Sequence, residues 1–124
     1  MPARSRALVL AAVLACAHTG PLDERAIDRV VRRHEGDIRA CYDIGLARVA
    51  GLAGTLRLDF TIEPSGATTG ARVSESTLEH PEVERCLVDI VGRWRFPESA
   101  ASTPVAYPLA FAPEEDLDAP PSAP

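Results

Sequence analysis

The stretch TLRLDFTI, residues 55–62, alternates apolar and polar side chains without interruption. A period of two residues places alternate side chains on opposite faces of a β-strand, so one face is buried and the other meets water. The stretch contains neither Gly nor Pro, which predicts a central place in a sheet. The apolar positions are Leu56, Leu58, Phe60 and Ile62.

Two weaker strands are predicted further along the chain. The segment EPSG, residues 63–66, predicts a turn, and a strand with Ala71 and Val73 on its inner face follows at about residues 68–77. A last strand spans residues 105–111, because large apolar residues there alternate with small ones. A right-handed crossover puts this strand on the far side of the first, so the predicted strand order is 2-1-3.

A helix is predicted before the strands, from Pro21 to about Ala47, with Asp23 and Glu24 near its positive end. One apolar stripe recurs at spacings of three and four residues, which is typical of an amphipathic helix. The stripe consists of Ile27, Val30, Val31, His34, Ile38, Cys41 and Tyr42.

A second helix is predicted over HPEVERCLVDIVGRWRF, residues 80–96, and Pro97 is expected to end it. Arg93 and Arg95 are then expected to face solvent near the negative end of the helix dipole. Trp94, the single tryptophan, is predicted to be the large core residue that closes this helix onto the sheet.

The element order predicts an α+β fold with two layers, α-β-β-α-β. It is expected to have a three-stranded antiparallel sheet of order 2-1-3, covered on one face by two helices. The domain is placed at residues 22–112. Residues 113–124 are acidic and rich in proline, which predicts a disordered tail.

The N-terminus predicts export. Arg4 and Arg6 precede nine apolar residues, 7–15, a run shorter than the roughly 20 residues that span a bilayer. VLAC, residues 13–16, resembles a bacterial lipobox, which predicts that residues 1–15 are a signal peptide and that Cys16 is a lipid anchor. The alternative is an A-x-A site with cleavage after Ala17, which removes Cys16.

Both cleavages leave Cys41 and Cys86 as a pair in an oxidising compartment. Both lie on or beside the apolar stripes that must meet over the sheet, so a disulfide between the two helices is predicted. The alternative is two free buried cysteines that act as small hydrophobic residues.

The segment GTLRLDFTIEPSGATTGARVSEST, then GRWRFP and an alternating last strand, resembles the TonB C-terminal domain. CYDIGL, ERC and VAYPLAF resemble more closely the AgmX/PglI C-terminal domain family of gliding-motility and envelope proteins. The resemblance covers roughly residues 27–111. The core signature is Tyr42, Phe60, Gly66, Trp94, Phe96, Pro97, Tyr107 and Phe111.

This resemblance implies a cell-envelope domain that binds an extended peptide as an added strand at the sheet edge. Only residues 17–21 separate Cys16 from the first helix, a reach of ~17 Å, so an energy transducer that crosses the periplasm is not expected. If Pro108 lies in the last strand, its missing N–H must face outward. Ala106, Pro108 and Ala110 then present the open edge, although Pro108 equally suits a guard against aggregation. The second strand is the fallback edge.

Composition and motifs point away from catalysis. The net charge is -5, from 13 basic residues, all Arg, and 18 acidic ones, so nucleic acid is not an expected partner. No histidines have ligand spacing, so we expect no metal, no cofactor and no enzyme activity. His34 is read as a core or boundary residue, and His80 as a helix-entry residue.

Two functions stay open. One is an interaction module that recognises an envelope protein or extended peptide, and the other is a structural subunit of a multiprotein envelope machine linked to motility or transport. An outer-membrane lipoprotein facing the periplasm is the expected location, and a soluble periplasmic or secreted protein is the alternative.

Overall fold

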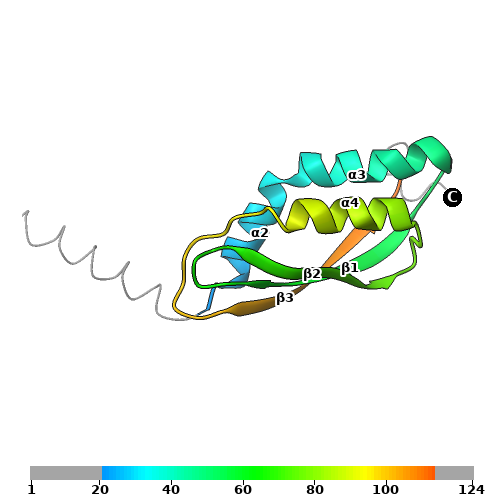
Figure 1. Ribbon diagram of the computed structural model, residues 1–124. Helices are drawn as coiled ribbons and strands as arrows, with labels where there is room; N and C mark the ends of the chain where they lie inside the picture. Colours follow the sequence, from blue (N-terminus) through cyan, green and yellow to red (C-terminus); the bar gives the residue numbers. More distant parts are fainter. Residues whose placement is uncertain (1–20, 114–124) are drawn as a thin grey trace, which may run out of the picture.

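The computed structural model describes residues 21–113, which form a three-stranded sheet with helices over one face (Figure 1). The sheet is antiparallel with the order β2-β1-β3, which confirms the predicted fold class and strand order. Its strands are β1 (Gly54–Ile62), β2 (Thr68–Ser76) and β3 (Thr103–Phe111). The helices are α2 (Glu24–Arg33), α3 (Glu35–Arg48) and α4 (Pro81–Val91).

The signal peptide, the lipid anchor Cys16 and the tail beyond Pro113 are predictions that lie outside the described residues. Within residues 21–113, no helix has the length and apolar character needed to cross a membrane.

β1 is the centre of the fold, as its alternation predicts. It pairs with β2 on one side and with β3 on the other, and its four apolar side chains are buried under the helices. These side chains pack in one cluster with buried helix residues, among them Val30, Val83, Leu87 and Val91. Figure 1 shows α3 and α4 side by side above the sheet, while α2 slopes away from α3.

The single long first helix was a wrong prediction, because the chain breaks at His34 into α2 and α3. The His34 N–H donates to the Val31 carbonyl at 2.9 Å, and the His34 carbonyl then accepts the first bonds of α3. The break turns α2 toward β3, where the Leu22 N–H donates to Thr103 Oγ1 at 3.1 Å. The apolar spacing is the same on both sides of His34, so periodicity did not reveal the break.

The second helix also differs from the prediction. α4 begins at Pro81 with His80 as its N-cap, as expected, but it ends at Val91 rather than at Pro97. Trp94 therefore lies beyond the helix, and Arg93 and Arg95 are exposed but not in its last turn.

Contacts with the β1–β2 hairpin explain why α4 ends early. The Phe96 N–H donates to the Gly66 carbonyl at 2.9 Å, and the backbone of Arg95 pairs with that of Ala67 in an isolated antiparallel β-bridge. Gly66 has a φ of 93°, and a Cβ there would lie 2.0 Å from the Phe96 carbonyl oxygen. Only glycine permits this approach, so the turn residue and the end of α4 depend on each other.

Trp94 occupies the predicted core place by this different route. It is 3% exposed, and its ring stacks on His34 with centroids 4.9 Å apart. Phe60 of β1 meets it edge-on at 6.3 Å. Trp94 therefore joins the α2–α3 break to the sheet, in addition to closing the layer below α4.

A disulfide links Cys41 on α3 to Cys86 on α4, with a Cα–Cα distance of 5.6 Å. The predicted pairing is therefore present. Cys41 is fully buried and Cys86 is partly exposed, so the bond lies between α3 and α4 at the boundary of the core.

Candidate functional site

A trough runs along the outer side of β3, between this strand and helices α2 and α3. We call it the edge trough. It consists of two cavities of about 460 and 500 Å³ that share Asp28, Tyr107 and Pro108. The edge trough extends from Pro104 to Ala112, so it follows nearly the whole of β3.

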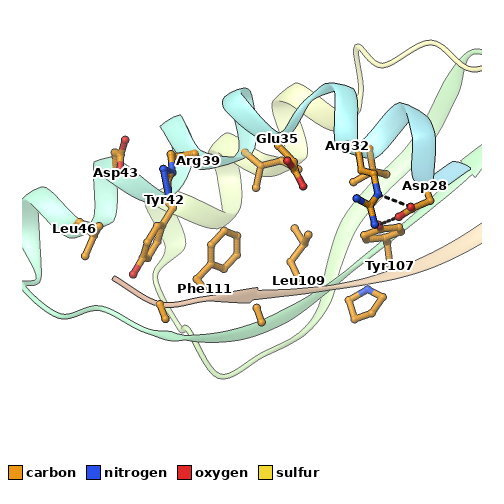
Figure 2. A pocket seen from close by; sticks show the side chains of 15 residues that line it. Asp28, Arg32, Glu35, Arg39, Tyr42, Asp43, Leu46, Tyr107, Leu109 and Phe111 are labelled. Carbon is orange, nitrogen blue, oxygen red and sulfur yellow. Dashed lines mark hydrogen bonds and ion pairs between the residues drawn. The ribbon is translucent and has the colours of Figure 1, made fainter. Parts of the chain in front are cut away.

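The end of the edge trough nearest the C-terminus of β3 is apolar. Figure 2 shows Phe111 and Leu109 pointing up from β3 beside Tyr42, which hangs down from α3. The Tyr42 and Phe111 rings lie 5.0 Å apart. The Tyr42 hydroxyl donates to the Leu52 carbonyl, which holds the ring in place, and Leu46 lies one turn further along α3.

Charged side chains line the helix side of the edge trough. Arg39 lies between Glu35 and Asp43 at spacings of four residues, above the apolar side chains of β3 (Figure 2). Opposite charges at this spacing face each other along a helix. The trough therefore has an apolar floor and a rim of mixed sign, which suits a peptide better than a single small anion.

A hydrogen-bonded bridge crosses the edge trough where its two cavities meet. The Tyr107 hydroxyl on β3 donates to Asp28 Oδ1 on α2 at 2.6 Å, and Arg32 Nε donates to Asp28 Oδ2 at 2.7 Å (Figure 2). These bonds from Tyr107 and Arg32 hold the pKa of Asp28 below its ordinary value. Burial, followed by the bond to the Asp28 carboxylate, raises the pKa of Tyr107 to about 12.

The bridge is expected to hold α2 against β3 over a defined pH range. The lowered pKa of Asp28 means that its stabilisation is present above the ordinary value of 3.8 and is lost as pH falls through the lowered pKa. The raised pKa of Tyr107 means that its stabilisation is present below 10.0 and is lost as pH rises through about 12.

The variant Tyr107→Phe tests this bridge. It keeps the ring but removes the donor, so we expect faster amide exchange in α2 at neutral pH and the loss of the phenol that titrates at about 12. Ultraviolet absorbance against pH and hydrogen exchange measure the two effects. An unchanged exchange rate in α2 would show that the buried side chains of α2 hold the helix without the bridge.

The backbone of β3 faces the edge trough at alternate residues. The Thr55 carbonyl accepts from the Thr77 N–H at 2.8 Å, so Thr55 points its polar groups away from β3. Backbone groups alternate along a strand, so Arg57 also points its N–H and carbonyl away from β3. Its partner Pro108 therefore points its backbone groups outward, away from β1. The donor that proline lacks is therefore not one that the sheet needs.

The same alternation turns Ala106 and Ala110 outward with Pro108, as the sequence predicts for this edge. Their side chains are exposed, whereas those of Val105, Tyr107 and Leu109 are half-buried toward the helices.

The opposite edge is less suited to pairing with another strand. β2 has two irregularities in its register with β1, one between the pairs of Arg57 and Leu58 and one between those of Asp59 and Thr61. The second includes Gly70, which has a φ of 65°. Bulges twist an edge strand and interrupt its ladder, so β2 offers no regular run of outward donors.

Five residues of the predicted core signature are buried, namely Tyr42, Phe60, Gly66, Trp94 and Phe96. Tyr107 and Phe111 are half-buried and pack against the core where they line the edge trough. Pro97 is exposed.

Sequence reasoning missed Asp28, Arg32 and Leu46 as trough residues. No local signal identifies them, since Asp28 and Tyr107 are 79 positions apart in the chain.

The histidines of the described chain have structural contacts. His34 stacks on Trp94 and lies 3.3 Å from the Asp37 carboxylate, and His80 Nδ1 accepts from the Val83 N–H at 3.4 Å. His34 is thus a boundary residue and His80 a helix-entry residue, as predicted. Among residues 21–113, no three His, Cys, Asp or Glu side chains gather as metal ligands would.

The sequence matches no protein-family model and no curated protein, so membership of the AgmX/PglI family stays a prediction. A solved structure that this chain resembles is the Helicobacter pylori TonB C-terminal domain, at 16% sequence identity and a TM-score of 0.41. The match covers 65% of this chain and 81% of that one. Because this likeness is distant, the strand order and register described above establish the architecture.

Proposed function

We propose that this protein is a non-catalytic interaction module of the cell envelope that binds an extended segment of another envelope protein by strand addition at β3. The observation that carries the proposal is the edge trough beside an open strand edge. An added strand would pair its backbone with the outward residues of β3 and place alternate side chains on the apolar floor.

The donors of this edge limit the pairing. Ala106 and Ala110 each offer an N–H and a carbonyl, whereas Pro108 offers a carbonyl alone. The fullest backbone pairing is therefore expected at Ala110, beside the apolar end formed with Tyr42 and Phe111. Pro108 interrupts the ladder, which weakens edge-to-edge association between copies and leaves partner binding dependent on side chains.

The variant Ala110→Pro tests strand addition. It removes one outward donor and leaves the β1–β3 ladder intact, and Ala110→Val is the matched control because it adds bulk but keeps the donor. We expect Ala110→Pro to weaken partner binding by up to about tenfold, the effect of one lost hydrogen bond, and Ala110→Val to weaken it less.

The measurement is a quantitative pulldown from detergent-solubilised envelopes with the full chain and both variants, followed by NMR mapping of the captured partner. Equal capture by both variants, with amide shifts confined to the solvent faces of the helices, would sink the strand-addition proposal. A stable stoichiometric complex would instead favour a structural subunit, the alternative function, over a module that captures peptides weakly.

The proposal includes export and a lipid anchor at Cys16, supported by the basic lead, the apolar run and the cysteine that follows. A diacylglyceryl group with an N-acyl chain exceeds the two lipid signals that stable anchoring needs. Ala17 is not the aspartate that often retains lipoproteins at the inner membrane, which favours the outer one. We expect the mass of the mature N-terminus to show an acylated Cys16. An unmodified chain that begins at His18 would contradict this.

A further inference from the structure

The rim at the apolar end of the edge trough carries a net negative charge. Arg32 Nε donates to Asp28 Oδ2 at 2.7 Å, so the two charges of the bridge already balance each other. The other charged side chains that line this end are Glu35, Arg39 and Asp43, of which two are acidic. Within residues 21–113, neither of these two carboxylates forms an ion pair. A bound segment that brings a positive charge would therefore complement this rim.

Glu35 lies over the middle of the apolar floor. It is the first residue of α3, and its side chain is exposed. Figure 2 shows Glu35 above Leu109, between the bridge at Tyr107 and the side chain of Arg39. A side chain that rises toward the helices from a strand beside Leu109 therefore meets Glu35 rather than Arg39.

The geometry of strand addition decides which position of a bound segment lies there. Side chains directly opposite each other in paired strands lie on the same face of the sheet. A strand added to β3 therefore turns toward the helices the side chains opposite Tyr107, Leu109 and Phe111, which are half-buried on that face. Since the backbone groups of Leu109 point toward β1, its pair with an antiparallel strand has no backbone hydrogen bonds. In such pairs the side chains approach most closely.

The surroundings of these three positions differ. A large side chain opposite Tyr107 would have to displace the 2.6 Å bond from the Tyr107 hydroxyl to Asp28. The position opposite Phe111 lies beside two aromatic rings, those of Phe111 and Tyr42, 5.0 Å apart. The position opposite Leu109 alone combines an apolar floor below with Glu35 above.

A long basic side chain fits both surfaces at this position. Its apolar stem can lie on Leu109 and Phe111 while its charged head stays at the rim. Arginine suits the place better than lysine, because a guanidinium group pairs with a carboxylate through two parallel hydrogen bonds and stacks on aromatic rings.

We propose that the segment bound at β3 carries an arginine opposite Leu109, with its guanidinium group paired to Glu35 and its stem on the apolar floor. Glu35 is then the residue that selects the partner by charge, while the outward backbone of Ala110 binds it without regard to sequence. The proposal rests on the proposed function, because it takes strand addition at β3 as the mode of binding.

The test uses the full chain and three synthetic peptides of the sequence TVTXTVT, in which X is Arg, Gln or Glu. The order of residues is the same from both ends, so the peptide offers β3 the same side chains in either strand direction. Amide shifts at Ala110 and Leu109 are followed by NMR as each peptide is added. We expect the Arg peptide to bind about fivefold more tightly than the Glu peptide, the effect of one exposed ion pair, with the Gln peptide between them. The difference should shrink in 1 M salt, which screens exposed charges.

Two variants of Glu35 assign the preference to this residue. Glu35→Gln is expected to remove most of the difference between the Arg and Glu peptides, and Glu35→Arg to reverse it. Glu35 is exposed, so neither change disturbs the core. Asp89→Asn is the matched control, because Asp89 is an exposed acidic residue of α4 that does not line the trough, and it should keep the order of the natural chain.

Equal affinities of the Arg and Glu peptides, with Ala110 shifting in both titrations, would overturn the inference and leave strand addition standing. A preference for the Arg peptide that both Glu35 variants retain would also overturn it, because another acidic group then holds the cation. The absence of shifts at Ala110 with every peptide would count against the inference and strand addition together. Shifts at Ala110 when the chain alone is diluted would assign the edge to a second copy of the chain instead.

Discussion

Replacing Cys41 and Cys86 together by Ala is expected to lower the free energy of unfolding by about 4 kcal/mol, from the loop that a separation of 45 residues closes. The unfolded chain gains conformational freedom once the link is gone. A domain of this size has a total stability of roughly 5–15 kcal/mol, so the loss is a large share of it. Denaturant unfolding followed by circular dichroism measures the change.

The natural protein unfolded in the presence of a reductant is the matched control, and its stability should fall by a similar amount. The loss also bears on function, because α3 carries Tyr42 and Leu46 into the edge trough and the disulfide ties α3 to α4. A double variant within about 1 kcal/mol of the natural protein would show that helix packing, rather than the disulfide, sets the stability.

Trp94→Ala is expected to cost about 4 kcal/mol, within the range for removing a buried aromatic side chain from a core. The indole fills the space between His34, Phe60 and Phe96, so its removal opens a cavity under the α2–α3 break. The chain there is held by contacts to this ring, and we expect α2 to lose protection from amide exchange before the sheet does.

Trp94→Phe separates packing from hydrogen bonding. Among the described residues, the buried Trp94 Nε1 has no hydrogen-bond partner, so replacing the indole by a phenyl ring loses no bond seen within residues 21–113. We therefore expect Trp94→Phe to cost clearly less than Trp94→Ala. Equal losses in the two variants would mean that the indole N–H makes a contact on which the fold depends.

The edge trough shows how far sequence reasoning reaches toward a site. The open edge of β3 was predictable, because Pro108 tolerates only an outward position in a paired strand. The side of the trough formed by α2 was not predictable, since Asp28 and Arg32 have the pattern of ordinary surface charges on a helix. They become trough residues only because the break at His34 brings α2 down to Tyr107.

The sequence by itself determined the central strand, the strand order and the class of the fold. It could do so because the alternation of apolar and polar side chains over residues 55–62, and the absence of Gly and Pro there, are local features of the sequence. They predict directly which face of the strand is buried and that the strand lies inside the sheet. Pairing between distant residues decided the rest. The Phe96 N–H donates to the Gly66 carbonyl and holds the chain that follows α4 against the β1–β2 turn. His34 stacks on Trp94 where the first helix bends. The Tyr107 hydroxyl donates to Asp28 across the trough. These contacts join segments far apart in the chain, and no local period records which distant group will satisfy a given donor or fill a given space.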